Sequence, residues 1–293
     1  METLALLRRK ASDVSFDVAR VCFVRSNGTT CKGLLPVLAR AFPLENHSDD
    51  GCPRCGTPKK TVSQASKTAK NAGYAARTGQ FASKKRKKSG HFIAIPASEC
   101  ADDLPVSPYV PPKKCLGFTA MMHGTAIDRD IVESIRLAEY RPMDPCSAKL
   151  LHFIRSVRGW IPVAAQLPIQ VRTLGVATAI DLLCTDAATK TKLILVEIKS
   201  TWSHAGTPAL IDACYRHSTE RTVANLPLSR YLQNQLQLWA MEYALRQEYG
   251  IAVHQAVVIR VGPTFVAEYP LNNRLRACEV HLLAKIRDSS VSS

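Results

Sequence analysis

Hydrophobic residues recur along the second half of the chain with two different periods, which divide it into helices and strands. Residues 173–185 and 192–198 are short apolar runs of the kind found in strands, whereas Leu232, Leu236, Trp239 and Tyr243 follow the spacing of one helix face. The pattern predicts helices at 126–140, 144–157 and 228–249, and strands at 161–171, 173–185, 192–198, 254–261 and 264–269. This order predicts an α/β domain whose central sheet is covered by helices on both faces.

The first 115 residues do not follow this pattern. Residues 1–50 hold short apolar runs, enough for two or three elements in a small N-terminal region. Residues 51–115 are largely polar and include a proline-rich stretch at 101–114, so we expect a basic, mostly flexible linker. The chain therefore divides into residues 1–50, residues 51–115 and a main domain at 116–293.

Positive charge is concentrated in the linker. Lys and Arg exceed Asp and Glu by 15 in the whole chain, and residues 54–88 hold eleven basic residues and no acidic one. Such a segment indicates a polyanionic partner, most simply the phosphate backbone of DNA or RNA. A lipid surface is disfavoured because no amphipathic apolar face accompanies the charges.

Five consecutive basic residues end this segment: Lys84, Lys85, Arg86, Lys87 and Lys88. The block is typical of a nuclear localisation signal, which a nuclear import receptor binds, and the same side chains can also contact DNA phosphates. We favour the nuclear signal, which implies a nuclear protein of a eukaryote or of a eukaryotic virus.

Ten cysteines are scattered along the chain, which predicts a reducing compartment, and no run of about 18 apolar residues predicts a membrane span. Cys52 and Cys55 have the spacing of half a Zn²⁺ site. Two interpretations stand. One is a zinc knuckle completed by Cys22 and Cys31 or by His47, and the other is an isolated thiol pair.

Charged residues interrupt the two apolar strands. Asp181 ends one run, and Glu197 and Lys199 stand two positions apart in the next. The two-residue period of a strand places Glu197 and Lys199 on one face, and a hairpin would bring Asp181 beside Glu197. A Glu-x-Lys pair can be a solvated strand edge, but both runs are apolar enough to be buried on both faces, where charges need compensation. Carboxylates suit Mg²⁺, and an ammonium group beside them suits an attacking water or a scissile phosphate.

Asp181, then Glu197-Ile198-Lys199, then a helix with the pattern Gln-Leu-x-x-Trp beginning at Gln235 resembles the PD-(D/E)xK nuclease superfamily, especially its RecB-like and lambda-exonuclease-like branch. The resemblance covers roughly residues 116–270. It implies a restriction-endonuclease-like core of order α-β-β-β-α-β, with a central mixed sheet flanked by helices and preceded by the basic N-terminal extension.

Residues 121–137 resemble the first helix of that family. Asp128 stands where the family has a histidine after the glycine that is Gly124 here, and Glu133 is a second candidate ligand. The resemblance implies that Asp128 joins Asp181, Glu197 and the Ile198 carbonyl in binding Mg²⁺ or Mn²⁺.

By the same resemblance, the catalytic residues are Asp181, Glu197, Lys199 and Gln235, with Gln235 ordering Lys199. The implied activity is metal-dependent hydrolysis of DNA phosphodiester bonds, by an exonuclease rather than an endonuclease, in replication, recombination or repair. The alternative is a catalytically inactive nucleic-acid-binding protein on the same fold. A zinc-dependent assembly protein, resting on Cys52 and Cys55 alone, ranks last.

Overall fold

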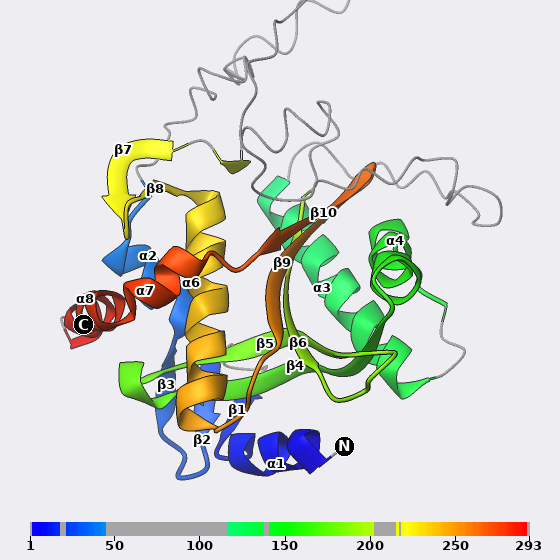
Figure 1. Cartoon of the computed structure of the whole chain (residues 1–293), viewed down its shortest axis with the longest axis horizontal. Helices are drawn as coiled ribbons and strands as arrows, with labels where there is room; N and C mark the ends of the chain where they lie inside the picture. The colour runs from blue at the N-terminus through cyan, green and yellow to red at the C-terminus, as the bar shows by residue number, and fades with distance from the viewer. Residues whose placement is uncertain are drawn as a thin grey trace, which may run out of the picture.

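The structure is a computed structural model that describes residues 2–17, 22–44, 116–137, 141–201, 215–216 and 218–291. Its centre is an eight-stranded mixed sheet with the strand order β1-β2-β3-β5-β6-β9-β10, in which β4 pairs with the other edge of β5 (Figure 1). The pairs β3–β5 and β6–β9 are parallel and the remaining pairs are antiparallel. The protein is thus a mixed α/β fold.

The strands of this sheet come from both ends of the chain. They are β1 (Val14–Asp17), β2 (Cys22–Arg25), β3 (Thr30–Gly33), β4 (Trp160–Val171), β5 (Val176–Asp186), β6 (Leu193–Ser200), β9 (Gln255–Gly262) and β10 (Phe265–Pro270). A separate two-stranded sheet pairs β7 (Ser218–Val223) with β8 (Leu226–Ser229). The predicted strands at 161–171, 173–185, 192–198, 254–261 and 264–269 are confirmed to within a few residues.

Strand β5 positions the site because two strands share one of its edges. Strand β4 pairs along almost the whole length of β5, so β3 and β6 both lie on the opposite edge. Strand β3 pairs at residues 176–177 and β6 pairs at residues 182–185. Residues 178–181 lie between these two pairings, and Asp181 is therefore at a split in the sheet.

Helices cover both faces of the sheet (Figure 1). One face carries α3 (Leu116–Arg136) and α4 (Pro145–His152), and α4 continues as the π-helical turn η2 (Phe153–Val157). The other carries α6 (Arg230–Tyr243), continued by η4 (Ala244–Glu248), with α2 (Leu34–Ala41), α7 (Asn273–Ala277) and α8 (Glu279–Val291) packed against it. Helix α1 (Glu2–Ala11) packs at one end of this layer, and the short 3-10 turn η3 (Arg172–Leu174) joins β4 to β5.

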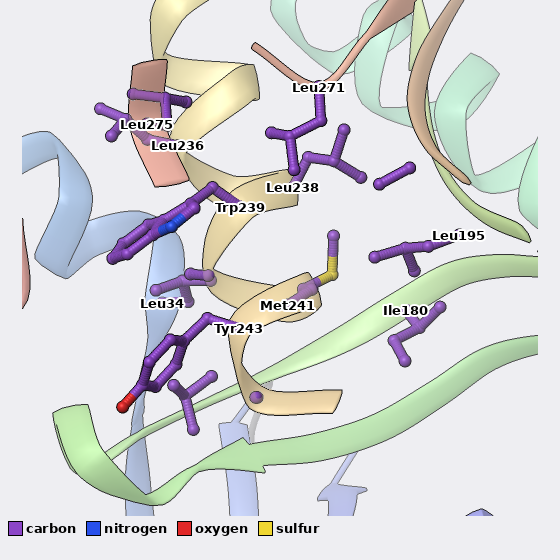
Figure 2. Close-up of a cluster of buried hydrophobic side chains, with 14 of the residues drawn as sticks. Leu34, Ile180, Leu195, Leu236, Leu238, Trp239, Met241, Tyr243, Leu271 and Leu275 are labelled. Atoms are coloured by element: carbon purple, nitrogen blue, oxygen red, sulfur yellow. The ribbon is translucent and has the colours of Figure 1, made fainter. Parts of the chain in front are cut away.

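The sheet separates two hydrophobic clusters, one on each face. The larger surrounds α6, where Trp239, Met241 and Tyr243 meet Leu34 of α2 and Leu195 of β6 (Figure 2). The smaller joins helices α3 and α4 to the opposite face of β5, β6 and β9. Burying a large apolar side chain contributes about 1.5–3 kcal/mol, so these clusters account for the main driving force of folding.

Helices α4 and α6 begin at polar N-cap residues. The Asp144 carboxylate accepts hydrogen bonds from the backbone N–H groups of Cys146 and Ser147, and the Ser229 hydroxyl accepts one from Leu232. Each cap satisfies N–H groups that a helix start leaves without a partner. The backbone N–H of Asp144 in turn donates to the buried carboxylate of Asp130 on α3, so one carboxylate fixes the α3–α4 connection.

The N-terminal residues share the sheet and core of the main domain. Strand β3 extends the sheet through β5, and α2 places Leu34, Val37 and Leu38 in the larger hydrophobic cluster. Helices α7 and α8 and the β7–β8 hairpin were not predicted from the sequence. No helix in the described ranges is long and apolar enough to cross a membrane.

Candidate active site

Asp181 and Glu197 lie side by side on neighbouring strands, as the sequence predicts. Strands β5 and β6 form an antiparallel hairpin in which Leu182 is opposite Val196, so Asp181 and Glu197 occupy the next pair of positions. Asp181 Oδ2 accepts a hydrogen bond of 2.8 Å from the backbone N–H of Ile198. Since the N–H and C=O of one residue face the same edge of a strand, the Ile198 carbonyl also faces β5.

The backbone is irregular at Asp181. Ile180 packs in the α6-side cluster, whereas Leu182 packs in the α3/α4-side cluster, so the two-residue alternation is broken between them. Gln166, opposite Asp181 on β4, has a left-handed backbone with φ 49°, which is uncommon for a residue other than glycine. Its side chain is also a hydrogen-bond partner of Asp181. The distortion directs Asp181 toward β6, and such strain is characteristic of functional sites.

Glu197 is fully buried, with 0% of its surface exposed. Its Oε1 forms an ion pair with Lys199 Nζ, while its Oε2 receives no hydrogen bond from any donor in the described part of the chain. Burial, together with repulsion from Asp181, raises the pKa of Glu197 to about 8. Burial also raises the pKa of Asp181, although Lys199 and the Ile198 N–H oppose the change.

Lys199 remains charged although its side chain is half-buried. Burial disfavours the ammonium group, but attraction by Glu197 and Asp181 outweighs this effect and raises the Lys199 pKa to about 12. A lysine with this pKa is protonated at neutral pH and cannot act as a general base. It can stabilise negative charge on a substrate.

Asp128 approaches the same group from helix α3. The helix passes close to the end of β6, where a Cβ added to Gly124 would lie 3.9 Å from Ser200 Oγ. Burial and then the charge of Asp181 raise the Asp128 pKa to about 7, and Lys199 opposes this change. Glu133, the other candidate on α3, instead forms an ion pair of 2.9 Å with Arg136.

Gln235 bonds Tyr269 and Asn272 rather than Lys199, which corrects the role that the family resemblance implied for it. Its side chain is buried, with Nε2 donating to the Tyr269 carbonyl (3.3 Å) and Oε1 accepting from the Asn272 N–H (2.9 Å). Gln237 makes the expected contact, because its Oε1 accepts a 3.1 Å hydrogen bond from Lys199 Nζ. Two residues along a helix correspond to a rotation of about 200°, so the two side chains point to different neighbours.

Gln237 belongs to a polar stripe on α6 that was not identified from the sequence. The stripe has the helical spacing i, i+3, i+4 and i+7 and consists of Arg230, Gln233, Asn234 and Gln237. Gln233 donates to the Phe42 carbonyl (3.1 Å) and Asn234 donates to the Tyr215 hydroxyl (2.8 Å). The signal in the sequence was this run of polar side chains on one face of an otherwise apolar helix.

Two pockets adjoin the carboxylates. A pocket of about 360 Å³ at the split between β3 and β6 is lined by Asp181 and Gln237 together with residues of β2, β3 and α2. A second pocket of about 370 Å³ lies beyond the end of β6 and is lined by Lys199, Arg230 and Arg260. No carboxylate is among the described residues lining the second pocket, so its three cationic side chains favour an anion there.

The chemistry of these donors fits a divalent cation. A buried carboxylate oxygen of Glu197 without a hydrogen-bond donor, facing a second carboxyl group, is stabilised when a cation lies between them. Across the described residues, no three Asp, Glu, His or Cys side chains converge as a complete metal site. Mg²⁺ commonly takes one or two protein carboxylates, with waters and substrate phosphates completing its shell.

The remaining predicted site residues lie outside the described ranges. These are the candidate zinc ligands Cys52 and Cys55 and the basic block Lys84, Lys85, Arg86, Lys87 and Lys88. Cys22 and Cys31, considered as a second zinc pair, are free cysteines on β2 and β3.

Comparison with known proteins leaves the family open. No protein-family model matches the chain, and no curated protein matches it. Among solved structures, the crystal structure of SSO0001 is similar at a TM-score of 0.27 with 14% sequence identity, over 60% of this chain and 88% of that one. A likeness of this size carries no argument about fold or activity.

Proposed function

We propose that this protein is a metal-dependent DNA nuclease with a restriction-endonuclease-like core. The observation that carries the proposal is the group at the split of the sheet formed by the buried Glu197 with the half-buried Asp181 and Lys199, in which Lys199 retains its charge. Buried carboxylates are costly to maintain, and perturbed pKa values of this kind are concentrated at functional sites. The element order of α3 and β4–β6, followed by α6 and β9, agrees with the core that the sequence resemblance implies.

Each residue has a distinct role in this proposal. Asp181, Glu197 and the Ile198 carbonyl would hold Mg²⁺ or Mn²⁺, and Asp128 on helix α3 would assist them. The bound cation lowers the pKa of a water molecule and neutralises charge on the scissile phosphate. Lys199 places its ammonium group beside the phosphate that occupies the pocket lined by Arg230 and Arg260, and Gln237 fixes the position of Lys199.

The basic segment outside the described ranges has two proposed roles, DNA binding and nuclear import. The basic residues at 54–88 add affinity for DNA that does not depend on sequence, and Lys84–Lys88 direct the protein to the nucleus. The setting is DNA replication, recombination or repair in a eukaryote or a eukaryotic virus. Exonuclease action on DNA ends is proposed ahead of endonuclease action.

A second candidate is a nucleic-acid-binding protein that no longer cleaves. The observation that favours it is the absence, within the described ranges, of three converging metal-ligand side chains. Asp128 is linked electrostatically to Asp181, but it does not complete a three-ligand site with Glu197. Purified wild-type protein distinguishes the two candidates directly, since only the first hydrolyses DNA.

The experiment is cleavage of labelled single-stranded, duplex and branched DNA across a range of Mg²⁺ and Mn²⁺ concentrations. Glu197→Ala should abolish hydrolysis while the protein stays folded and bound to DNA. Lys199→Ala should also abolish hydrolysis but retain metal binding, because an ammonium group is not a ligand. Asp128→Ala should raise the metal concentration needed for half-maximal activity without removing activity.

Lys192→Ala is the matched control for Lys199→Ala, because it removes the same charge from an exposed position before β6. It should cleave like the wild type. A wild-type protein that cleaves none of these substrates in either metal refutes the nuclease proposal and supports the binding protein. Cleavage that survives Glu197→Ala means that the site lies elsewhere.

A further inference from the structure

A third pocket is lined by Tyr231 and Tyr269, whose rings both contact Tyr215. Its volume is about 380 Å³, and the described residues lining it include Arg216, Ser229, Tyr231, Tyr269 and Asn272. We call it the tyrosine pocket. It is built where β8, the start of α6 and the end of β10 meet, and none of its described lining residues is a carboxylate.

Three tyrosines form the wall between this pocket and the cationic one. The ring centroids of Tyr215, Tyr231 and Tyr269 lie 5.2–5.8 Å from one another, in tilted or edge-to-face contact. Tyr215 lines the cationic pocket with Lys199, whereas Tyr231 and Tyr269 line the tyrosine pocket. The ring contacts of Tyr215 with Tyr231 and Tyr269 therefore link the lining of one pocket to the lining of the other.

Arginine side chains cover the tyrosine rings on both sides. The guanidinium carbon of Arg216 lies 4.8 Å from the Tyr231 centroid and 5.1 Å from that of Tyr269. On the other side, Arg260 lies 3.9 Å from the centroid of Tyr215. Planar guanidinium groups and aromatic rings are the surfaces on which proteins stack nucleobases.

The pocket wall is held in place from within. Gln235 is fully buried and bonds both the Tyr269 carbonyl and the Asn272 N–H, so it fixes the chain on either side of Pro270. Asn234, one residue earlier, holds the Tyr215 hydroxyl. A pocket whose walls are fixed in this way loses little freedom when a ligand binds, which favours affinity.

We propose that the tyrosine pocket binds an unpaired nucleobase of a DNA strand whose phosphate occupies the cationic pocket. The inference rests on the proposed nuclease function and specifies its substrate as single-stranded DNA or a DNA end with an unpaired nucleotide. Duplex bases are stacked on their neighbours, so a base enters such a pocket only when it is unpaired. The uncharged and polar lining residues beside Arg216 suit a base better than a second phosphate.

The test compares binding of two strands that carry the same phosphates. Fluorescence anisotropy with EDTA, which prevents cleavage, is measured for a short oligothymidylate and for an abasic strand of equal length. The wild type should bind the thymidylate strand about tenfold more tightly, in line with the stacking of a base on an aromatic side chain. Tyr231→Ala should abolish this difference and leave affinity for the abasic strand within about twofold of the wild-type value.

Tyr231→Phe keeps the ring and should keep the difference, and Lys192→Ala should also keep it. Equal binding of both strands by the wild type, or a difference that survives in folded Tyr231→Ala protein, overturns the proposal. If thymidine monophosphate competes as well as the strand, the pocket binds a free nucleotide, which also overturns it.

Photocrosslinking tests the wild-type protein without a variant. A strand that contains 5-iodouracil should crosslink to Tyr231, Tyr269 or Arg216 after irradiation, as found by peptide mass spectrometry. Crosslinks confined to other segments refute the assignment. Because binding is measured without metal, a protein that cleaves DNA but shows no base dependence leaves the nuclease proposal intact. Base-dependent binding without any cleavage supports the pocket and refutes the nuclease.

Discussion

Replacing Glu197 by glutamine is expected to make the stability of the metal-free protein less dependent on pH. Glu197 has a pKa of about 8 in the folded protein, against an ordinary value of 4.5, because it is buried beside Asp181. The folded protein therefore holds a proton that the unfolded chain releases. The stability that this proton provides is complete below pH 4.5 and falls as the pH rises to about 8.

The interval between the two values is about 3.5 pH units, and each unit corresponds to about 1.4 kcal/mol. The loss of stability across this range is thus on the order of 5 kcal/mol for the group. Asp181 and Asp128 titrate with Glu197, so this figure is an upper limit for Glu197 itself. A glutamine side chain does not titrate, so Glu197→Gln should remove the part of this pH-dependent stability that Glu197 contributes.

The assay is urea unfolding with EDTA, followed by circular dichroism at several pH values between about 5 and 8. The difference in unfolding free energy between Glu197→Gln and the wild type should grow by up to about 1.4 kcal/mol per pH unit. Saturating Mg²⁺ should stabilise the wild type, by about 2.7 kcal/mol at a hundredfold excess over its Kd, but not the variant. A difference that stays constant with pH refutes the argument.

Glu242→Gln is the matched control for this experiment. Glu242 is also buried, but its Oε1 lies 3.3 Å from both Arg246 and Arg276. The substitution removes a buried carboxylate that two partly exposed arginines share, so the variant should lose stability, by about 2 kcal/mol. The same urea series measures this loss, which separates the effect of losing a buried carboxylate from the effect particular to Glu197.

Four further changes test separate parts of the chain. Gln237→Ala should lower kcat about tenfold with little change in KM, because it removes the hydrogen bond that positions Lys199. Gln235→Ala should instead lower the free energy of unfolding by about 2–3 kcal/mol and leave the cleavage rate per folded molecule unchanged. Deleting residues 54–88 should weaken DNA binding and flatten its dependence on salt; an unchanged slope of affinity against salt excludes this segment as a DNA contact. Alanine at all five positions of Lys84–Lys88 should keep a large fluorescent fusion in the cytoplasm, and undiminished nuclear accumulation excludes the localisation signal.

Local periodicity was enough to predict strands β4, β5, β6, β9 and β10 and helices α3, α4 and α6. It could not predict that β3 joins β5, because that pairing links residues 32–33 to residues 176–177 and leaves no local pattern. Helix α8 was missed for a different reason. Of its described side chains, only Leu282 and Ile286 are fully buried, so its apolar stripe is too short to stand out.

The sequence predicted those parts of the candidate site that follow from the alternation of side chains along a strand. Alternation and a hairpin placed Glu197 beside Lys199 and Asp181. Choosing between Gln235 and Gln237 required knowing which side of α6 faces β6, and this depends on packing against the whole sheet. The contribution of Gln166 could not be predicted from the sequence, because a glutamine does not indicate a left-handed backbone within a strand.

The pairing of β3 with β5 means that residues 30–44 bind the rest of the protein much as a tethered peptide would. Residues 45–115 lie between them and α3 along the chain. Because the two parts belong to one covalent chain, their pairing is intramolecular and does not depend on protein concentration. A single cut within residues 45–115 would turn the pairing into an association between two fragments. The pocket beside Asp181, which β2, β3 and α2 help to line, would then form only as far as the fragments associate.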